Sequence, residues 1–348
     1  MVPAALPRRA AGDALKRLLW IAPLLLLAAF CALPLPQSRK APRALQAARG
    51  LGPLRAGAAR VRIDLPEHPV LAGYAGLHDA REAAQPVFAR ALVVEAGGVK
   101  ATVASLDTLL IPPDFPRPAG CSLLAATHTH TGPGGLWDNP VAGLLGAGWP
   151  DQMQRYQAAR ALATAVEQAN AALAPAELQM GRELWRQGPA KARSEGPIDP
   201  TLVALRLRRP SGAAVATLVV YAMHPTSAPR DELSADWPGQ VDAADAPVMV
   251  LQGAVGNATW PRDAALAEPV AIEVEKLLHD VPALSEVPLD CDMHTVEPPP
   301  LEASLRVPWL LRRAATNALV LAFSTEATQT RLRLGPLTLL GVPGEPVG

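Results

Sequence analysis

The chain has 348 residues, equal numbers of basic and acidic side chains, and an aromatic content of only 4%. A formal net charge of zero argues against binding to a phosphate backbone, so we expect no nucleic-acid partner. The three cysteines, no two of them close in sequence, exclude a disulfide-rich scaffold and a cysteine-based zinc site.

The N-terminal segment has the pattern of an export signal. Leu18–Leu35 carries no charged residue and follows four basic side chains, those of Arg8, Arg9, Lys16 and Arg17. A basic flank before an apolar core is typical of export, and this core is long enough to cross a bilayer as a helix. We predict a transmembrane signal anchor over residues 1–36, with a cleaved signal peptide as the alternative. The body of the protein would then be extracytoplasmic, in the periplasm or outside the cell, and either membrane-anchored or secreted.

The composition changes after this segment. Residues 37–57 are rich in Arg, Ala and Pro, which favours a tether between the membrane and the body of the protein. An amphipathic helix lying on the membrane over Ala41–Leu51 is an equally good interpretation. Residues 58–348 then form a single domain, long enough for a substantial hydrophobic core.

Apolar runs predict a body built on β-sheets. The run Cys121–Ala126 has the length and composition of a buried strand. The other strand candidates are Val61–Asp64, Phe88–Glu95, Ala101–Leu106, Leu202–Leu207, Ala214–Tyr221, Val248–Leu251 and Arg331–Gly341.

Two helices are expected besides the strands. Asp151 and Gln154 have the spacing of a capping box, which predicts a helix that runs to about Leu173 with apolar side chains on one face. A second helix is expected over Asp263–His279. Strands with helices packed outside them indicate the α/β class, with mixed β-sheets flanked by helices.

Cys121 and Cys291 both lie in apolar, strand-like runs. Free cysteine is common in such buried positions, so we favour two free thiols. A disulfide between them is the alternative in an oxidising compartment.

A histidine pair follows the strand predicted at Cys121–Ala126. Residues Thr127–Gly135 read Thr-His-Thr-His-Thr-Gly-Pro-Gly-Gly. Side chains two apart in an extended backbone point the same way, so His128 and His130 should leave the strand end side by side. Because imidazole is a common ligand for zinc, this pair indicates a metal site.

Two further apolar runs end in side chains that can bind a metal. Val219–Met223 is followed by His224, and Leu337–Val342 is followed by Pro343-Gly344-Glu345. Two imidazoles and a carboxylate, with one position open, are the ligands expected of a hydrolytic zinc site.

Four blocks of the sequence resemble the neutral and alkaline non-lysosomal ceramidases, over about Ala58 to Gly348. They are Gly73-Tyr74-Ala75 with Phe88-Ala89-Arg90-Ala91, Thr127–Gly135, His224-Pro225-Thr226 with Ser234–Gly239, and Gly341–Glu345. The resemblance implies that His128, His224 and Glu345 bind zinc, and that His130 lies beside the metal as an acid/base group. It also implies that the substrate is the amide of a fatty acid.

Two features depart from this family. Its Gly-Asp-x-Ser segment corresponds here to a stretch in which Asn257 replaces the carboxylate, and Thr259 keeps the hydroxyl of the serine but adds a methyl group. Its tyrosine ligand, downstream of the Pro-Gly-Glu segment, and its C-terminal immunoglobulin-like domain have no counterpart, since the three tyrosines Tyr74, Tyr156 and Tyr221 all come earlier. We expect either a truncated or degenerate member, or a metal shell completed by another donor or a second water.

Other polar residues are candidates for supporting roles. Arg193 with Ser194 resembles a family segment whose arginine helps at the active site, so we group Arg193 with His130 and Thr259 as catalytic residues. Asp107 and Asp236 either accept the second N–H of the ligating imidazoles or only cap turns.

The expected function is that of a zinc-dependent hydrolase, which cuts an N-acyl, ceramide-like amide and releases a fatty acid and a sphingoid-type amine. His130 would protonate the leaving amine. Another metal hydrolase, such as a metallo-β-lactamase-like enzyme, is a rival, but Gly132 stands where that class has an aspartate. A degenerate, membrane-tethered lipid-binding protein is the second rival.

Overall fold

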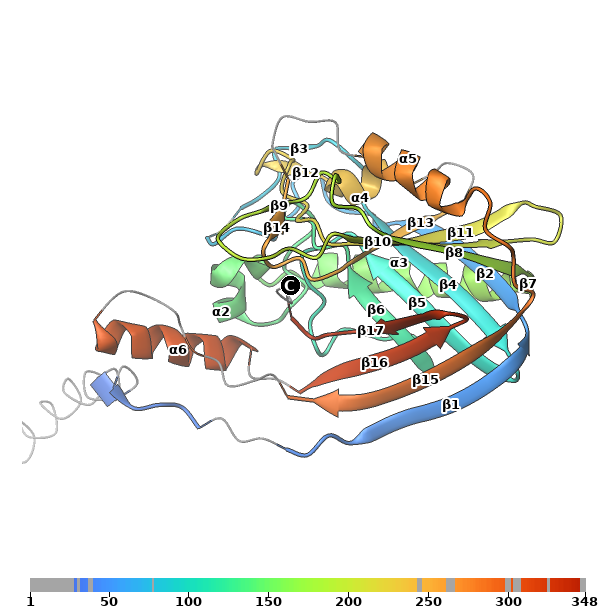
Figure 1. Ribbon diagram of the computed structural model, residues 1–348. Helices are drawn as coiled ribbons and strands as arrows, with labels where there is room; N and C mark the ends of the chain where they lie inside the picture. Colours follow the sequence, from blue (N-terminus) through green and yellow to red (C-terminus); the bar gives the residue numbers. More distant parts are fainter. Residues whose placement is uncertain are drawn as a thin grey trace, which may run out of the picture. The chain divides into compact units, whose positions relative to one another are not determined.

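The computed structural model describes residues 28–29, 32–36, 40–76, 78–242, 246–260, 267–297, 302, 308–323 and 326–344. The chain divides into two compact units (Figure 1). One contains Met1–Lys40 and Glu297–Thr325, and the other contains Ala41–Val296 and Glu326–Gly348. All the sequence-predicted site residues belong to the second unit, which has the mixed sheets and few helices expected of the α/β class.

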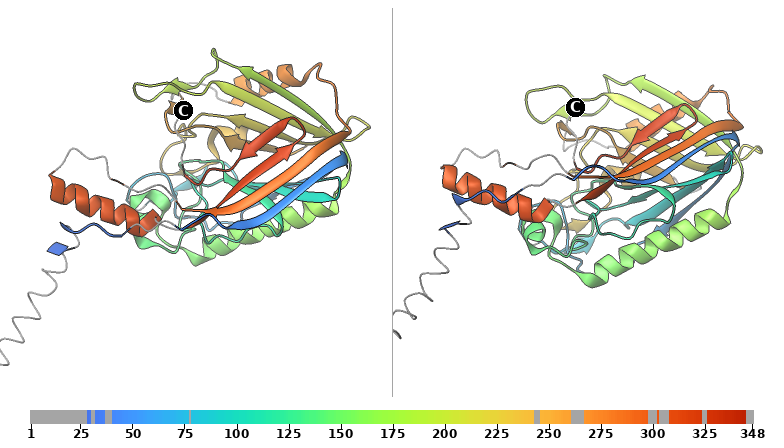
Figure 2. Two further views of the ribbon diagram at one scale, coloured as in Figure 1. Left: turned by 60° about the horizontal axis from the view of Figure 1, so that its bottom comes forward. Right: turned by 90° about the horizontal axis from the view of Figure 1, so that it is seen from below.

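A five-stranded sheet carries the histidine pair. Its strands, in spatial order, are β6 (Cys121–Ala126), β5 (Val99–Leu106), β4 (Phe88–Ala96), β2 (Arg55–Arg62) and β7 (Ala174–Pro175). Only β5 and β6 are parallel, and the other neighbours are antiparallel. Helix α3 (Gln152–Ala171) lies along one face of this sheet, where Ala165 and Ala169 pack against Ala91 and Val93 (Figure 2). These small side chains allow the helix to approach the strands closely.

A four-stranded sheet carries His224. Its order is β13 (Val248–Gln252), β11 (Ala214–Tyr221), β10 (Thr201–Arg208) and β8 (Glu177–Leu184), with β11 and β13 parallel. Helices α4 (Asp236–Gln240) and α5 (Ala267–Leu278) cover one face of this sheet. Trp237 and Val270 pack there against Val219 and Leu202, all of them buried.

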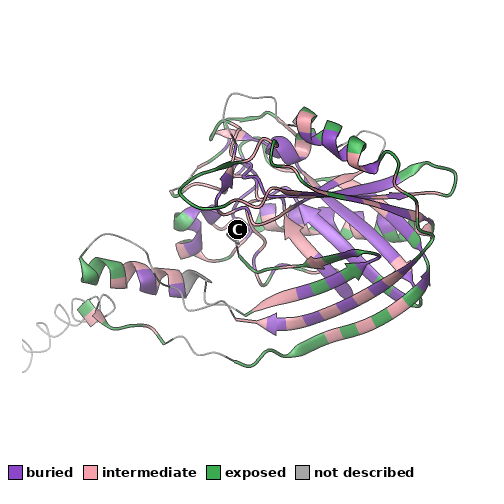
Figure 3. Cartoon of the chain, in the orientation of Figure 1, coloured by how far each residue is buried: buried purple, intermediate pink, exposed green. Residues whose placement is uncertain are grey.

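A third sheet closes the core. It consists of β1 (Ala44–Pro53), β15 (Glu286–Val296), β16 (Ala327–Leu334) and β17 (Leu337–Leu340), all antiparallel. Strand β15 alternates buried and half-buried residues, the pattern of a strand with one face in a core. One apolar cluster joins the inner faces of the three sheets, with Leu92, Leu205 and Leu289 all fully buried in it (Figure 3). Both faces of two sheets are therefore covered, which explains their nearly continuous apolar runs.

Short elements complete the second unit. Strand β3 (Glu82–Ala83) pairs with β12 (Glu232–Leu233), and β9 (Lys191–Ala192) pairs with β14 (Ala258–Thr259). Helix α2 (Pro140–Ala142) leads into a π-helical turn, η1 (Gly143–Ala147).

The first unit contains one described long helix, α6 (Trp309–Phe323). Its buried Asn317 donates to the carbonyl oxygen of Leu33 at 2.9 Å and accepts from the backbone N–H of Leu35 at 3.1 Å. Within the described ranges, no helix has both the length and the apolar character needed to cross a bilayer. Most of the apolar core of the predicted anchor, Leu18–Leu35, lies outside those ranges.

The structure corrects several predicted boundaries. The tether predicted over residues 37–57 is wrong from Ala44 onward, because β1 and the start of β2 occupy that stretch. The amphipathic helix over Ala41–Leu51 is wrong for the same reason. Arg331–Gly341 is two strands, β16 and β17, joined by a turn at Gly335, which has a φ of +60° that glycine adopts without strain.

The helix predicted after Pro150 is confirmed, but its capping box is only half formed. Asp151 accepts from the backbone N–H of Gln154 at 2.9 Å. The Gln154 side chain does not return to Asp151 and instead bonds the backbone of Val70 and Gly134. Gln154 therefore fastens the helix to the segments that surround the histidine pair.

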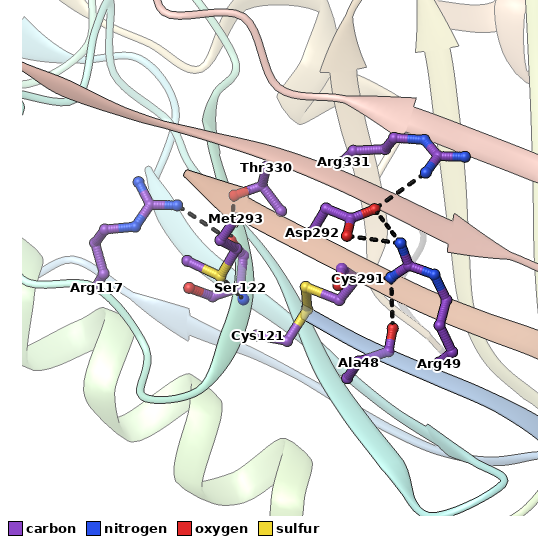
Figure 4. Close-up of a disulfide and its surroundings, with 10 residues drawn as sticks. All are labelled: Ala48, Arg49, Arg117, Cys121, Ser122, Cys291, Asp292, Met293, Thr330 and Arg331. Atoms are coloured by element: carbon purple, nitrogen blue, oxygen red, sulfur yellow. Dashed lines mark hydrogen bonds and ion pairs between the residues drawn. A yellow bond between two sulfur atoms is a disulfide. The ribbon is translucent and has the colours of Figure 1, made fainter. Parts of the chain in front are cut away.

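Cys121 and Cys291 form a disulfide, so the prediction of two free thiols is wrong (Figure 4). The bond joins β6 to β15, and the two cysteines are buried and 170 positions apart in sequence. A hydrogen bond from the Thr330 hydroxyl to the Ser122 carbonyl oxygen links the same two sheets at 2.8 Å. The strand that leads to His128 is thus covalently attached to the third sheet.

Removing this disulfide should destabilise the second unit. The double variant Cys121→Ala/Cys291→Ala should lose about 2–4 kcal/mol of unfolding free energy, because the denatured chain regains the freedom of a long closed loop. Urea unfolding at pH 7 would measure the change. Reduction of the wild type should produce a similar shift and leave the double variant unaffected; equal stability of reduced and oxidised wild type would contradict the prediction.

Candidate metal centre

Three imidazoles meet where strands of two different sheets end. His128 and His130 follow β6, and His224 follows β11. Their ring centroids are 5.1 Å apart for His128 and His130, 5.0 Å for His128 and His224, and 5.3 Å for His130 and His224. One ligand atom from each ring lies within 4.8 Å of the others, so the trio could hold a metal ion. The predicted convergence of these histidines is observed, whereas Glu345 lies outside the described residues.

Backbone carbonyls orient all three rings. The Nδ1 atoms of His128, His130 and His224 lie 2.9 Å, 2.9 Å and 3.0 Å from the carbonyl oxygens of Leu109, Gly73 and Ala258, respectively. Because a carbonyl oxygen only accepts, each Nδ1 carries the proton, and the lone pair of the neutral ring lies on Nε2. Ligating histidines are held in this way in metal sites, so the donor set fits a zinc ion.

The chain around the imidazoles is conformationally unusual. Among the described residues, His128 and Asp236 are the two non-glycine positions with positive φ, at +66° and +57°. Such conformations cost energy and concentrate at functional sites. They also show that the backbone at His128 is not the extended strand assumed from the His-x-His spacing. A Cβ on Gly73 would lie 2.2 Å from the carbonyl oxygen of His130, so only glycine allows this close approach.

Asp107 supports the site indirectly. Its carboxylate accepts from Arg90 Nη1 and from the Phe88 N–H, each at 2.8 Å, and not from an imidazole. Burial raises the pKa of the Asp107 carboxyl, and the Arg90 guanidinium opposes that rise. The turn that follows Asp107 provides Thr108, whose carbonyl oxygen accepts from the His128 N–H at 3.0 Å. Asp107 therefore positions His128 through the backbone. The prediction that its carboxylate accepts an imidazole N–H is replaced by this indirect role.

Asp236 fixes the segment after His224. Its buried carboxylate accepts from the Ser227 N–H at 2.7 Å, the Ser227 hydroxyl at 2.7 Å, the Ala228 N–H at 2.8 Å and the Trp237 N–H at 2.6 Å. Like Asp107, it acts on the backbone and does not bond an imidazole. Both predicted carboxylate partners of the rings are therefore replaced by carbonyl oxygens.

Arg193 lies directly at the centre. Its Nη1 is 3.1 Å from Nε2 of His224, the nitrogen that carries the lone pair. Asn257 holds the arginine in place by accepting from the Arg193 N–H at 2.8 Å through its own carbonyl oxygen, and from the Ser194 N–H at 3.1 Å through its side chain. A cation bound at His224 would take over the lone pair and release the guanidinium toward a ligand.

Thr259 lies in β14, one residue beyond the carbonyl oxygen of Ala258 that accepts from His224 Nδ1. It pairs with Lys191 across the β9–β14 ladder. Thr259 is thus close to the centre along the chain, and its catalytic role stays a prediction.

Three neighbours of the imidazoles were not predicted. The Tyr74 ring lies 5.6 Å from the His130 ring, and the Arg230 guanidinium carbon lies 4.3 Å from the centre of the Tyr74 ring. Gln252, at the end of β13, donates to the carbonyl oxygen of Thr127 at 2.9 Å and so joins the two sheets at the site. Tyr74 belongs to a block that suggested the family resemblance, but nothing in the sequence links any of these three to the histidines.

Exposed apolar side chains lie on the segment that adjoins the centre. Gly73, whose carbonyl oxygen holds His130, donates its N–H to Gly146 at 2.8 Å in the π-helical turn. That turn exposes Leu144 and Leu145, and Trp149, two residues after it, is a third exposed large apolar side chain. Exposed apolar groups beside a polar centre often mark a ligand-binding surface.

Comparison with known proteins identifies the fold. No protein-family model matches this sequence, and no curated protein matches it either. Solved structures do match: the neutral ceramidase from Pseudomonas aeruginosa at 17% identity and a TM-score of 0.66, and a ceramidase complexed with C2 at 18% identity and a TM-score of 0.65. Each match covers 84% of this chain, but only 62% and 64% of the respective ceramidase chains. The expected resemblance to neutral ceramidases is thereby confirmed at the level of the fold.

Proposed function

We propose, starting from the neutral-ceramidase fold of this chain, that the protein is a zinc-dependent hydrolase of N-acyl amide bonds. The substrate would be ceramide-like, and the products would be a fatty acid and a sphingoid-type amine. The observation that carries the proposal is the trio of imidazoles whose ligand atoms lie within 4.8 Å of one another. A trio with all three Nδ1 atoms bonded to carbonyl oxygens is the arrangement of a metal centre and is unusual in a hydrophobic core.

The zinc ligands in this proposal are His128, His224 and Glu345. When bound there, zinc would supply Lewis acidity that polarises a carbonyl group and lowers the pKa of a water molecule. The side chains prepare the site for it, since the carbonyl oxygens of Leu109 and Ala258 keep the two Nε2 lone pairs available.

His130 has a different task in this scheme, the one that the family resemblance implies, and its ring also contacts Tyr74. Its neutral Nε2 would accept a proton from the attacking water and return it to the departing amine, which is a poor leaving group until it is protonated. Arg193 would direct its N–H groups at the oxygen of the acyl group as negative charge develops. Thr259 is proposed as a further hydroxyl close to the reacting amide.

The apolar surface next to the centre supports a fatty acyl group in the substrate. Leu144, Leu145 and Trp149 are each about half exposed on the segment bonded to Gly73. Covering such side chains with an acyl chain would remove apolar area from water, which is favourable at about 25 cal/mol per Å².

An extracytoplasmic location is part of the proposal. The Cys121–Cys291 disulfide supports it, because disulfides persist in oxidising compartments. The basic residues followed by the apolar run Leu18–Leu35 also support export, with the membrane anchor preferred to a cleaved signal.

The His130→Ala variant tests the division of roles. It should keep its zinc and lose about 10²- to 10⁴-fold in turnover, the usual contribution of a positioned acid/base group. The assay is release of fatty acid from an N-acyl sphingoid base by the purified full chain, with and without a chelator, together with elemental analysis of the protein. Loss of zinc from the variant would instead make His130 a ligand. Zinc-loaded wild type without any hydrolysis would favour the lipid-binding alternative.

A further inference from the structure

Two guanidinium groups lie near the three imidazoles. Arg193 Nη1 is 3.1 Å from Nε2 of the buried His224. Arg230 approaches from the solvent, since it is exposed while Tyr74 and His130 are half-buried. Its guanidinium carbon lies 4.3 Å from the centre of the Tyr74 ring, which in turn lies 5.6 Å from the His130 ring. A stack of Arg230, Tyr74 and His130 therefore leads from the surface to the centre.

The position of Arg230 is built into the segment that carries His224. Asp236 accepts from the backbone N–H groups of Ser227 and Ala228, at 2.7 Å and 2.8 Å, and so fixes the stretch between His224 and Arg230. The face of the Tyr74 ring then holds the guanidinium by a cation–π contact. Arg230 is thus better ordered than an exposed arginine on a free loop.

Most of the described carboxylates near these arginines are bonded to other groups, and Glu232 lies beside Glu82 and Asp231. Asp107 is bonded to Arg90 and Phe88, and Asp236 makes four hydrogen bonds within its own segment. Asp231, next to Arg230, pairs with Arg81 at 3.3 Å. The candidate metal group among the described residues consists of histidines alone. Arg193 and Arg230 are therefore the cationic side chains that the described contacts place at or next to the centre, and a guanidinium attracts an anionic ligand.

We infer that the substrate carries an anionic group on the amine side of its amide bond, bound at the mouth of the centre by Arg230. This inference rests on the proposed amide hydrolysis, and it replaces the neutral sphingoid-type amine of that proposal by an amine that carries an anionic group. The hydroxyl groups of a neutral diol accept weaker hydrogen bonds from a guanidinium, whereas a carboxylate or phosphate accepts paired, charge-assisted ones. The substrate class is then a fatty-acylated amino acid or a fatty-acylated amino phosphate.

Three substrates with one acyl chain separate these head groups. They are N-dodecanoylglycine with a carboxylate, N-dodecanoylethanolamine phosphate with a phosphate, and N-dodecanoylethanolamine with no charge. The wild type should show a kcat/KM at least about tenfold higher for one of the two anionic substrates than for the neutral one, the size of a charge-assisted hydrogen bond. Which anionic substrate is preferred identifies the head group.

Arg230→Gln should remove this preference. The ratio of kcat/KM between the preferred anionic substrate and the neutral one should fall about tenfold or more, mainly through KM. Arg230→Lys, which keeps the charge but not the planar fork, should restore part of the ratio. Arg81→Gln is the matched control, because it removes an exposed arginine paired with the neighbouring Asp231 and should leave the ratio unchanged.

A wild-type preference for the neutral substrate would overturn the inference, and so would an unchanged ratio in Arg230→Gln. Calorimetric binding of N-dodecanoylglycine and N-dodecanoylethanolamine phosphate to the metal-stripped full chain keeps this result separate from the proposed hydrolysis. One outcome is that either anionic compound binds, that Arg230→Gln weakens this binding about tenfold, and that the zinc-loaded wild type hydrolyses neither. This outcome would retain the anion site and reject the hydrolase. Turnover of the neutral substrate alone would retain the hydrolase and reject the anion site.

Discussion

The His224→Ala variant should lose its bound zinc and its hydrolytic activity together. His224 is 1% exposed and is fixed by the carbonyl oxygen of Ala258 at 3.0 Å, so its Nε2 lone pair is held at the centre and alanine offers no lone pair in its place. Removing a group that only hydrogen-bonds and orients a metal-binding histidine already lowers the metal affinity about 10- to 100-fold. Removing the metal-binding histidine itself should lower the affinity more. Elemental analysis after dialysis, compared with the rate of fatty-acid release, measures both effects.

His294→Ala provides the matched control for this loss. His294 lies in β15, where its ring bonds the Gln329 side chain at 2.9 Å, away from the imidazole trio. This variant should keep the zinc content and activity of the wild type. Wild-type zinc content in His224→Ala would remove the proposed metal centre, and the proposed function with it.

The Arg90→Met variant should lose about 3–5 kcal/mol of unfolding free energy, the typical cost of removing one partner from a buried ion pair. Arg90 is 1% exposed and bonds Asp107 at 2.8 Å and Asp242 at 2.9 Å. Without the guanidinium, the fully buried Asp107 carboxylate keeps no cationic partner, whereas Asp242 still pairs with Arg60 at 2.9 Å. Urea unfolding would measure the difference.

The loss of unfolding free energy in Arg90→Met should become smaller as the pH falls. Burial already raises the pKa of the Asp107 carboxyl above its ordinary value of 3.8, and removing Arg90 takes away the charge that opposes this rise. A carboxyl whose pKa is higher in the folded than in the unfolded state binds protons more readily when folded, so acid stabilises the folded variant relative to neutral pH. The double variant Arg90→Met/Asp107→Asn should recover part of the loss at pH 7. A loss of unfolding free energy that becomes larger at acidic pH would contradict this account.

Most strands of the two helix-covered sheets could be predicted from the sequence. Phe88–Glu95, Ala214–Tyr221 and Cys121–Ala126 are apolar on both faces because helices cover one side and the shared core covers the other. The third sheet was harder to recognise. Strand β1, at Ala44–Pro53, has exposed and half-buried residues along nearly its whole length, and its Arg and Ala content resembles that of a linker. Its pairing with β15 depends on residues more than 200 positions away.

The disulfide illustrates the same limit. Cys121 and Cys291 each have the burial of a free core thiol, and only the packing of β6 against β15 brings them together. Similarly, Tyr74 contacts His130, and Arg230 contacts Tyr74. These contacts join loops, and no local sequence pattern predicts their geometry.

The sequence by itself determined the α/β class, the apolar strands and the three histidines that follow them, because periodicity and strand-end position are local properties of a chain. Only the tertiary structure decided which carbonyl oxygens hold the imidazoles, that Asp107 and Asp236 support backbone segments, and that Arg193 contacts the His224 ring. These outcomes depend on distances between segments far apart in sequence. Such distances are set by the packing of whole sheets against one another.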